Sequence, residues 1–199
     1  MTTNRASRWR IFCAVALPEP TRELVLHHIK RLQSTVPDAR ASWSRDENLH
    51  LTIKFLGEIP ERFVADVCSA AARAVAGLAP FSLRLERAGA FPVRGQPRVL
   101  WLGLSDSLGQ LHELHARLEN EAVLAGFAKD DRPFQPHLTI ARLREPQTVR
   151  TLAAVHRQLD FEPAEFAVSE LLVIRSELGS SGSKYSVVTR HRLGPSQEP

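Results

Sequence analysis

Cysteine is scarce in this chain of 199 residues, which contains two, Cys13 and Cys68. Two cysteines cannot form the several bridges that staple small secreted domains, nor the clustered thiolates of a structural zinc site. Cys13 lies in an apolar, strand-like run, and Cys68 lies in an alanine-rich segment typical of a helix. We therefore predict that both are reduced thiols buried in the core.

Long hydrophobic runs are also absent. No apolar stretch approaches the roughly 20 residues that span a bilayer, and the opening MTTNRASRWR lacks the apolar segment of a secretory signal. With 43% hydrophobic and 24% charged residues, the chain has enough apolar content to bury a sizeable core. These features predict a globular cytoplasmic protein without a membrane segment, and we expect a monomer.

Lysine is also scarce, since only four of the 26 lysine and arginine residues are lysines. Arginine suits phosphate recognition, since its planar guanidinium donates paired hydrogen bonds. An arginine-rich composition can equally reflect genome base usage, and the 22 acidic residues leave a net charge of only +4. Charge alone therefore neither indicates nor excludes a nucleic-acid partner.

The sequence does contain alternating strand-like and helix-like segments. Runs rich in β-formers predict strands, and leucines three or four apart predict amphipathic helices. The predicted strands are residues 10–17, 48–57, 81–90, 98–104, 134–142, 166–175 and 184–193, and the predicted helices are 18–34, 60–76, 107–125 and 148–159. The last two strands flank a glycine- and serine-rich turn and predict a β-hairpin. No low-complexity linker interrupts this order, so we predict one α+β domain over residues 1–199.

The residues His-Leu-Thr-Ile occur twice, as His50–Ile53 and His137–Ile140, and are called here the HLTI strands. Because side chains alternate along a strand, each histidine shares a face with its threonine, and the leucine and isoleucine face the core. Each HLTI strand is followed by a helix and two strands. The halves are therefore predicted to be related by an approximate twofold axis that brings the histidines face to face across a cleft.

Two facing histidines suit phosphodiester hydrolysis. The reaction needs a base to deprotonate water and an acid to protonate the leaving oxygen, on opposite sides of phosphorus. Of two imidazoles with pKa values of about 6.5, one can be neutral and act as the base while the other is protonated and acts as the acid. This predicts a bell-shaped rate profile with its maximum between about pH 6 and 8. The hydroxyls of Thr52 and Thr139 can donate to phosphate oxygens. One such motif alone is weak evidence, because strand histidines are more often structural.

The sequence around both motifs resembles the two-histidine (2H) phosphoesterases, and specifically the LigT/ThpR-like RNA 2',3'-cyclic phosphodiesterases, once named 2'-5' RNA ligases. The similar segments are RIFCAVALP, NLHLTIKFLGE, FPVRGQPRVLWLGL, RPFQPHLTIAR and the closing hairpin with Tyr185. They follow the family order over nearly the whole chain. The resemblance implies a bilobal pseudo-twofold 2H phosphoesterase fold, with two antiparallel sheets flanking a central cleft and helices outside.

The resemblance also assigns Arg142 to the phosphate site. Arg142 is five residues after His137, so simple alternation sends it to the opposite face, unless a strand end or bulge after Ile140 re-aims it. Trp43 is our candidate for stacking a terminal base. Alternation places Phe55 in the core, and Trp101 also has a strong core interpretation.

The remaining basic residues are interpreted structurally. We expect Lys54, Arg94 and Arg98 to be solvated surface charges, as isolated basic residues usually are. His115 borders the leucine stripe of its predicted helix, and the spacing of His112 and His115 specifies no third or fourth metal ligand. The other histidines have charged or polar neighbours and are predicted at the surface: His27, His28, His156 and His191.

We predict an enzyme that converts the 2',3'-cyclic phosphate of RNA ends to a 2'-phosphate, with no metal or cofactor. His50 is assigned as acid and His137 as base, although a pseudo-symmetric site makes these roles interchangeable on sequence evidence. A related alternative is a 2'-5' phosphodiesterase, RNA ligase or small cyclic-nucleotide phosphodiesterase. A different class of alternative is a non-catalytic module that binds RNA ends, against which two intact histidines argue.

Overall fold

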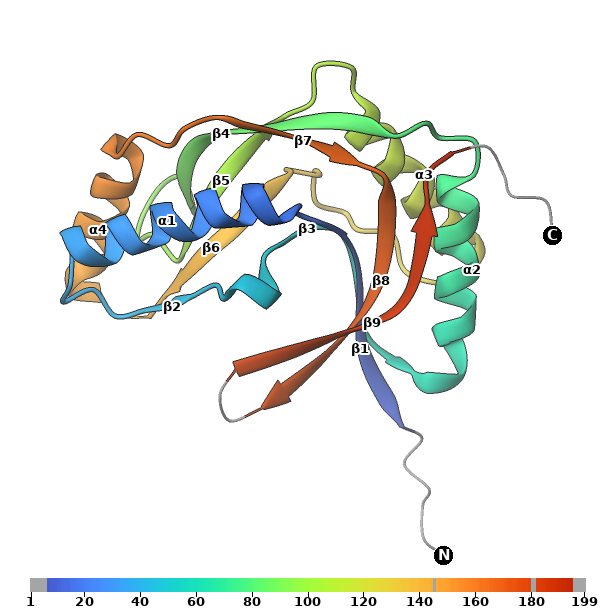
Figure 1. Cartoon of the computed structure of the whole chain (residues 1–199). Helices are drawn as coiled ribbons and strands as arrows, with labels where there is room; N and C mark the ends of the chain where they lie inside the picture. The colour runs from blue at the N-terminus through green and yellow to red at the C-terminus, as the bar shows by residue number, and fades with distance from the viewer. Residues whose placement is uncertain (1–6, 145, 180–181, 195–199) are drawn as a thin grey trace, which may run out of the picture.

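The computed structural model describes residues 7–144, 146–179 and 182–194, which form two sheets with helices beside them (Figure 1). One sheet has the strand order β3 (His50–Pro60), β1 (Arg8–Ala16), β8 (Glu170–Gly179), β9 (Gly182–Arg192). The other has the order β2 (Ala41–Trp43), β6 (His137–Leu143), β5 (Val99–Ser105), β4 (Phe81–Phe91), β7 (Ala164–Val168). Every pairing within these sheets is antiparallel, which confirms the predicted α+β class.

The helices pack beside the sheets, as expected. α2 (Val64–Val75) contacts β8 and β9 and also packs on α3 (Gln110–Leu124), whereas α1 (Glu19–Thr35) and α4 (Pro146–Gln158) contact β7 and β4 of the other sheet. Two short 3-10 turns, η1 (Asp46–Asn48) and η2 (Glu61–Phe63), lie at the two ends of β3. None of the helices in the described part of the chain is long and apolar enough to cross a membrane.

The two sheets correspond strand for strand, because β3-β1-β8 in one matches β6-β5-β4 in the other. β1 and β5 each precede an HLTI strand by one helix, and β4 and β8 each come after one. β4, which comes after β3, therefore lies in the sheet of β6, and β8, which comes after β6, lies in the sheet of β3. This exchange ties the two sheets together and agrees with the predicted pseudo-twofold relation.

The predicted strand 166–175 is wrong as a single element. The chain leaves one sheet after Val168 and enters the other at Glu170, so β7 and β8 belong to different sheets. The carbonyl of Ser169, at this crossover, accepts a hydrogen bond from the amide of Leu193. The sequence gives no sign of this change, because a continuous apolar run has the same pattern whether it forms one strand or two.

The buried core corrects two further predictions. His28 and His156 are not surface residues, because they are 2% and 0% exposed and lie 3.1 Å apart between His28 Nε2 and His156 Nδ1. His156 Nε2 also donates to the carbonyl of Trp101, so the pair holds α1 and α4 against the sheet. Cys13 is a fully buried free thiol, as predicted, and burial raises its pKa to about 12, but Cys68 is partly exposed.

Candidate active site

The two HLTI strands, β3 and β6, lie side by side where the sheets meet, with Cα atoms that approach within 8 Å. Along each strand the histidine and threonine are half-buried, and the leucine and isoleucine are buried on the opposite face. The face that carries His50 and Thr52, and the face that carries His137 and Thr139, are called here the histidine faces. The predicted alternation therefore holds through both motifs.

Both imidazole rings are anchored in the same way. Nδ1 of His50 lies 2.8 Å from the carbonyl oxygen of Asn48, and Nδ1 of His137 lies 2.8 Å from that of Gln135. A carbonyl can only accept, so Nδ1 carries the proton in each neutral ring and Nε2 is the basic nitrogen. The two residues before each histidine thus fix its tautomer, and nothing in the HLTI motif itself indicated this.

The surroundings of the two rings differ. His50 is enclosed by Phe12 and Tyr185, with ring centroids at 4.8 and 5.2 Å, and its Nε2 accepts a hydrogen bond from the Thr52 hydroxyl at 3.1 Å. His137 has one aromatic neighbour among the described residues, Phe91, at 5.0 Å. His50 therefore lies in the more apolar setting of the two.

A β-bulge follows the threonine in both strands. Cys13 and Ala14 of β1 pair with Lys54 and Thr52, which leaves Ile53 as the extra residue. Leu100 and Trp101 of β5 pair with Ala141 and Thr139, so Ile140 is the extra residue in β6. Each bulge breaks the alternation at the same place in the motif, and two consecutive residues after the threonine are buried.

The bulges return the fifth residue after each histidine to the histidine face. In β6 this residue is Arg142, which is exposed, as the bulge that we considered after Ile140 would require. In β3 it is Phe55, which pairs with Phe12 and is 54% exposed. The expectation that Phe55 lies in the core is wrong, because strict alternation does not survive the bulge at Ile53.

Arg142 acts on both histidines. Burial lowers the pKa of His50 to about 4, the bond to Asn48 opposes this shift, and the charge of Arg142 adds to it. Burial also lowers the pKa of His137, with the same opposition from Gln135 and the same contribution from Arg142. One guanidinium is thus close enough to influence both rings, which supports a single site between the two strands.

Lys54 is not a solvated surface charge. It is 4% exposed, and its Nζ lies 2.8 Å from both carboxylate oxygens of Glu119 on α3. Glu119 also accepts a hydrogen bond from the amide of Asp130. His115, one turn before Glu119, stacks on Phe134 with centroids 4.0 Å apart. These contacts tie β3 to α3 and to the segment that leads into β6.

The structure does not bring Trp43 to the histidine face. Ser42 pairs with Arg142 and Trp43 with Ala141, so Trp43 faces the opposite side, where it packs against the main core. Trp101 is half-buried and pairs with Thr139, so it shares the histidine face and the core interpretation of Trp101 is wrong. Its indole lies against the backbone of Gly89, where any Cβ would overlap it. Arg94 and Arg98 are exposed, in agreement with their surface interpretation.

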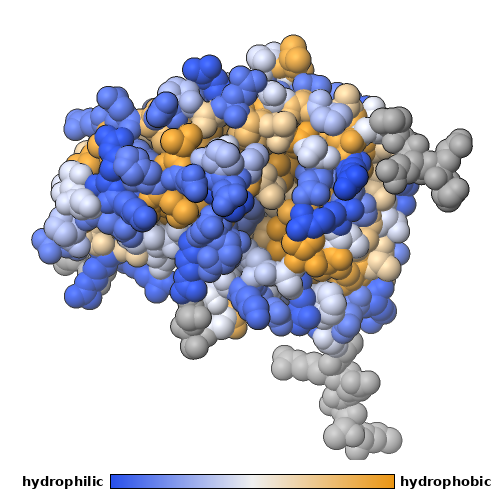
Figure 2. Space-filling view, in the orientation of Figure 1, coloured by the Kyte–Doolittle hydropathy of each residue, from blue (hydrophilic) through white to orange (hydrophobic). Residues whose placement is uncertain are grey.

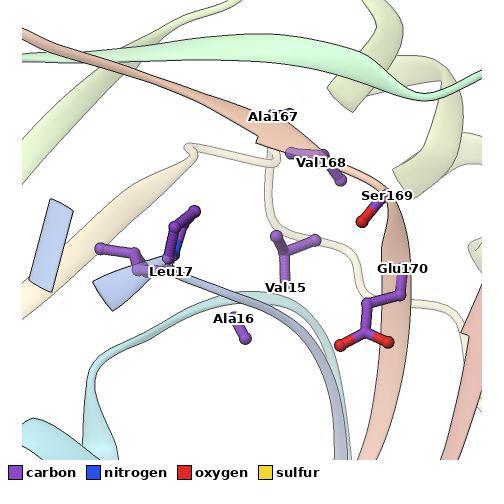
Figure 3. Close-up of a pocket in the computed structure, with 8 residues that line it drawn as sticks. Val15, Ala16, Leu17, Ala167, Val168, Ser169 and Glu170 are labelled. Carbon is purple, nitrogen blue, oxygen red and sulfur yellow. The ribbon is translucent and has the colours of Figure 1, made fainter. Parts of the chain in front are cut away.

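A cavity of about 190 Å³ lies where β1 ends and β7 passes into β8 (Figure 3). Its lining includes Ala16, Ser169 and Glu170, and Ala16 is the register partner of His50. The cavity therefore lies beside the strand of His50, although neither histidine lines it. Within residues 7–144, 146–179 and 182–194, no three histidine, cysteine, aspartate or glutamate side chains group as metal ligands.

Comparison with known proteins places this geometry in a family. The family model described as the 2'-5' RNA ligase superfamily matches residues 18–180. The chain belongs to the 2'-5' RNA ligase superfamily. This membership confirms the family resemblance of the sequence.

Relatives in the superfamily align over most of their length. A Methanothermobacter thermautotrophicus protein named RNA 2',3'-cyclic phosphodiesterase is 33% identical, with 92% of this chain and 98% of the relative covered. A Thermotoga maritima protein of the same name is 32% identical, with 90% and 92% covered. Among solved structures, Thermus thermophilus TT0787 superposes with a TM-score of 0.74 at 30% identity over 92% of this chain and 97% of that one. Escherichia coli LigT complexed with 3'-AMP gives 0.74 at 27% identity over 94% and 99%.

Proposed function

We propose that this protein hydrolyses the 2',3'-cyclic phosphate at the end of an RNA to a 2'-phosphate. One observation carries the proposal: two neighbouring strands each hold a histidine by the same backbone contact, with a threonine two residues later. The charge of Arg142 acts on both histidines. Relatives over most of the chain bear the name RNA 2',3'-cyclic phosphodiesterase, which supports this substrate over the alternatives.

The proposed reaction uses the two rings in opposite senses. Nε2 of neutral His137 takes a proton from water as the oxygen attacks phosphorus, and the bond between phosphorus and O3' breaks. Protonated His50 gives its Nε2 proton to O3', which leaves a free 3'-hydroxyl and a 2'-phosphate. Each ring ends in the form in which the other began, and solvent restores both.

The non-bridging oxygens need donors while charge accumulates on them. The hydroxyls of Thr52 and Thr139 and the guanidinium of Arg142 lie on the histidine faces and are proposed to fill this role. Arg142 adds a fixed positive charge, which also attracts the anionic substrate. Both histidines come from one chain, so we propose that a single copy forms a complete site.

The test is an assay on a short RNA that ends in a 2',3'-cyclic phosphate, with separation of the 2'- and 3'-phosphate products. We expect the 2' isomer to accumulate and His27→Ala, a change of an exposed histidine on α1, to leave the rate unaltered. Activity is also expected to persist after exhaustive chelation, because imidazoles and hydroxyls perform every step. Binding without turnover would instead support the RNA-end-binding alternative, and joining of two RNA ends as the dominant reaction would support a ligase.

A further inference from the structure

The side chain of Trp101 lies over two glycines on the histidine face of the five-stranded sheet. Trp101 pairs with Gly89 of β4 and with Thr139 of β6, so these three residues form one row across the sheet. A Cβ at Gly89 would lie 2.2 Å from the nearest indole atom, and a Cβ at Gly103 would lie 3.1 Å from the ring. The indole therefore occupies space that a side chain on either glycine would fill.

The main chain and the ring of Trp101 are held by different means. α1 and α4 lie against the five-stranded sheet, and their outer surface carries mostly hydrophilic side chains (Figures 1 and 2). His156 of α4 is fully buried, and its Nε2 donates to the Trp101 carbonyl at 3.0 Å. In the described part of the chain, the indole Nε1 is buried without a hydrogen-bond partner. The main chain is thus fixed by a hydrogen bond, whereas the ring is fixed by its fit over the glycines.

Phe91 connects this indole to His137. The ring centroid of Phe91 lies 5.1 Å from that of Trp101 and 5.0 Å from that of His137, to which it is nearly perpendicular. In the register, Phe91 and His137 belong to the rows on either side of the row of Trp101, so their rings meet beside the indole. The bond from Nδ1 to the carbonyl of Gln135 holds the imidazole at one point, and the ring of Phe91 restricts its tilt about that point.

We propose that Trp101 is a positioning residue that acts through Phe91 and sets the direction of Nε2 of His137. This inference rests on the proposed function, in which Nε2 takes a proton from water. Misplacement of a reacting group by about 1 Å can cost on the order of 10²-fold in rate. His50 belongs to the other sheet and has different aromatic neighbours, so a displaced indole should affect one histidine and not the other.

The experiment moves the indole without changing it. Gly89→Ala adds one methyl group under the ring, and the backbone accepts it because φ at Gly89 is not positive. The rigid ring must shift, so kcat is expected to fall roughly 10-fold or more with little change in KM. Gly103→Ala should cost less, because the ring needs to move by only a few tenths of an ångström. Gly179→Ala is the matched control, since its Cβ would make an ordinary contact at 3.4 Å.

A titration separates positioning from a general loss of structure. Burial lowers the pKa of His137, so a displaced Phe91 should expose the ring and raise that pKa. NMR titration of Gly89→Ala is expected to show this rise for His137 and no change for His50, in a variant whose thermal unfolding matches wild type. If Gly89→Ala does not fold, Gly103→Ala gives the same comparison. Equal shifts of both histidines, or no shift of His137, would overturn the positioning role.

A double-mutant cycle tests whether the indole is the mediator. Trp101→Leu removes the ring, so adding Gly89→Ala in that background should lower kcat no further. A second loss as large as in wild type would mean that the methyl group acts by another route, and the proposal would be wrong. Absence of turnover by wild type would instead count against the hydrolysis. The titration of His137 needs no substrate and decides the positioning role in that case.

Discussion

The two HLTI strands are built alike up to the threonine and differ after it. Both histidines are held by the carbonyl two residues before them, and both strands bulge at the following isoleucine. The next two positions are Lys54 and Phe55 in β3 but Ala141 and Arg142 in β6. The repeated backbone therefore provides a symmetric pair of proton-transfer groups, and these two positions are the first at which the two strands differ.

Each unlike position has its own consequence. Lys54 is buried in an ion pair with Glu119, which anchors β3 to α3, whereas Ala141 is a fully buried member of the main core. Phe55 and Arg142 both reach the histidine face and present opposite chemistry there. The two sides of the site thus differ in chemistry although both histidines are anchored in the same way.

The largest expected effect comes from removing what the strands share. His50→Ala and His137→Ala should each lower single-turnover rates by about 10²-fold or more, the usual worth of a general acid or base. Rates are measured on variants whose thermal unfolding matches wild type. If either variant retained nearly full activity, one imidazole would suffice and the two-histidine mechanism would be wrong.

The features that the two HLTI strands share were easier to predict from the sequence than the positions at which they differ. The period-two pattern predicted both HLTI strands and placed the histidine and threonine together, because alternation holds from His50 to Thr52 and from His137 to Thr139. The bulges leave no composition signal, so alternation failed for Phe55, and Arg142 was placed by family resemblance rather than by period.

Buried polar residues were missed for a different reason. Lys54 pairs with Glu119, which is 65 residues away in the sequence, and His28 contacts His156, which is 128 residues away. Their burial therefore depends on tertiary partners. A single sequence shows the polar side chain but not its partner. The crossover at Ser169 is likewise a tertiary event within a uniform apolar run.

The second effect is on stability and concerns β3 alone. Lys54→Met leaves Glu119 buried without its cation, so we expect a loss of about 3–5 kcal/mol in the free energy of unfolding. Urea unfolding measures this, and Lys30→Met, at an exposed site on α1, should change it by less than about 0.5 kcal/mol. The double variant Lys54→Met with Glu119→Leu should recover much of the loss. A single variant as stable as wild type would mean that the pair contributes little to holding β3.

The third effect is expected when the positive charge of Arg142 is removed from β6. Arg142→Ala should raise KM for a cyclic-phosphate end by roughly 10-fold or more, because a hydrogen bond to a charged group is lost. Loss of a nearby positive charge should also raise the pKa of both histidines. Arg144→Ala, two residues on and exposed, is the control. An unchanged KM would place the phosphate away from this arginine.

The fourth effect tests the hydroxyls. Thr52→Val and Thr139→Val should each cost less than either histidine variant, on the order of 10-fold in kcat, because one phosphate contact is lost and proton transfer remains. Thr52→Val should also raise the pKa of His50, since the Thr52 hydroxyl donates to the neutral ring and favours it. NMR titration of the imidazoles measures this, with Thr139→Val expected to shift His137 less. Equal shifts in the two variants would contradict the difference between the two surroundings.

The smallest effect is a displacement between two pH profiles. Burial lowers the pKa of both histidines, to about 4 for His50, so both rings are mostly neutral in the free enzyme at pH 7. Because kcat/KM reports the free enzyme, its bell should peak on the acid side of the window of about pH 6 to 8 that unperturbed histidines predict. A bound phosphate favours the cation and raises both pKa values, so kcat should peak at higher pH than kcat/KM. Neither limb of the bell can be assigned to one histidine, because the titrations of the two rings are coupled. Coincident profiles would mean that the phosphate does not sit between the histidines, and a kcat profile that keeps rising to alkaline pH would mean that neither ring acts as an acid.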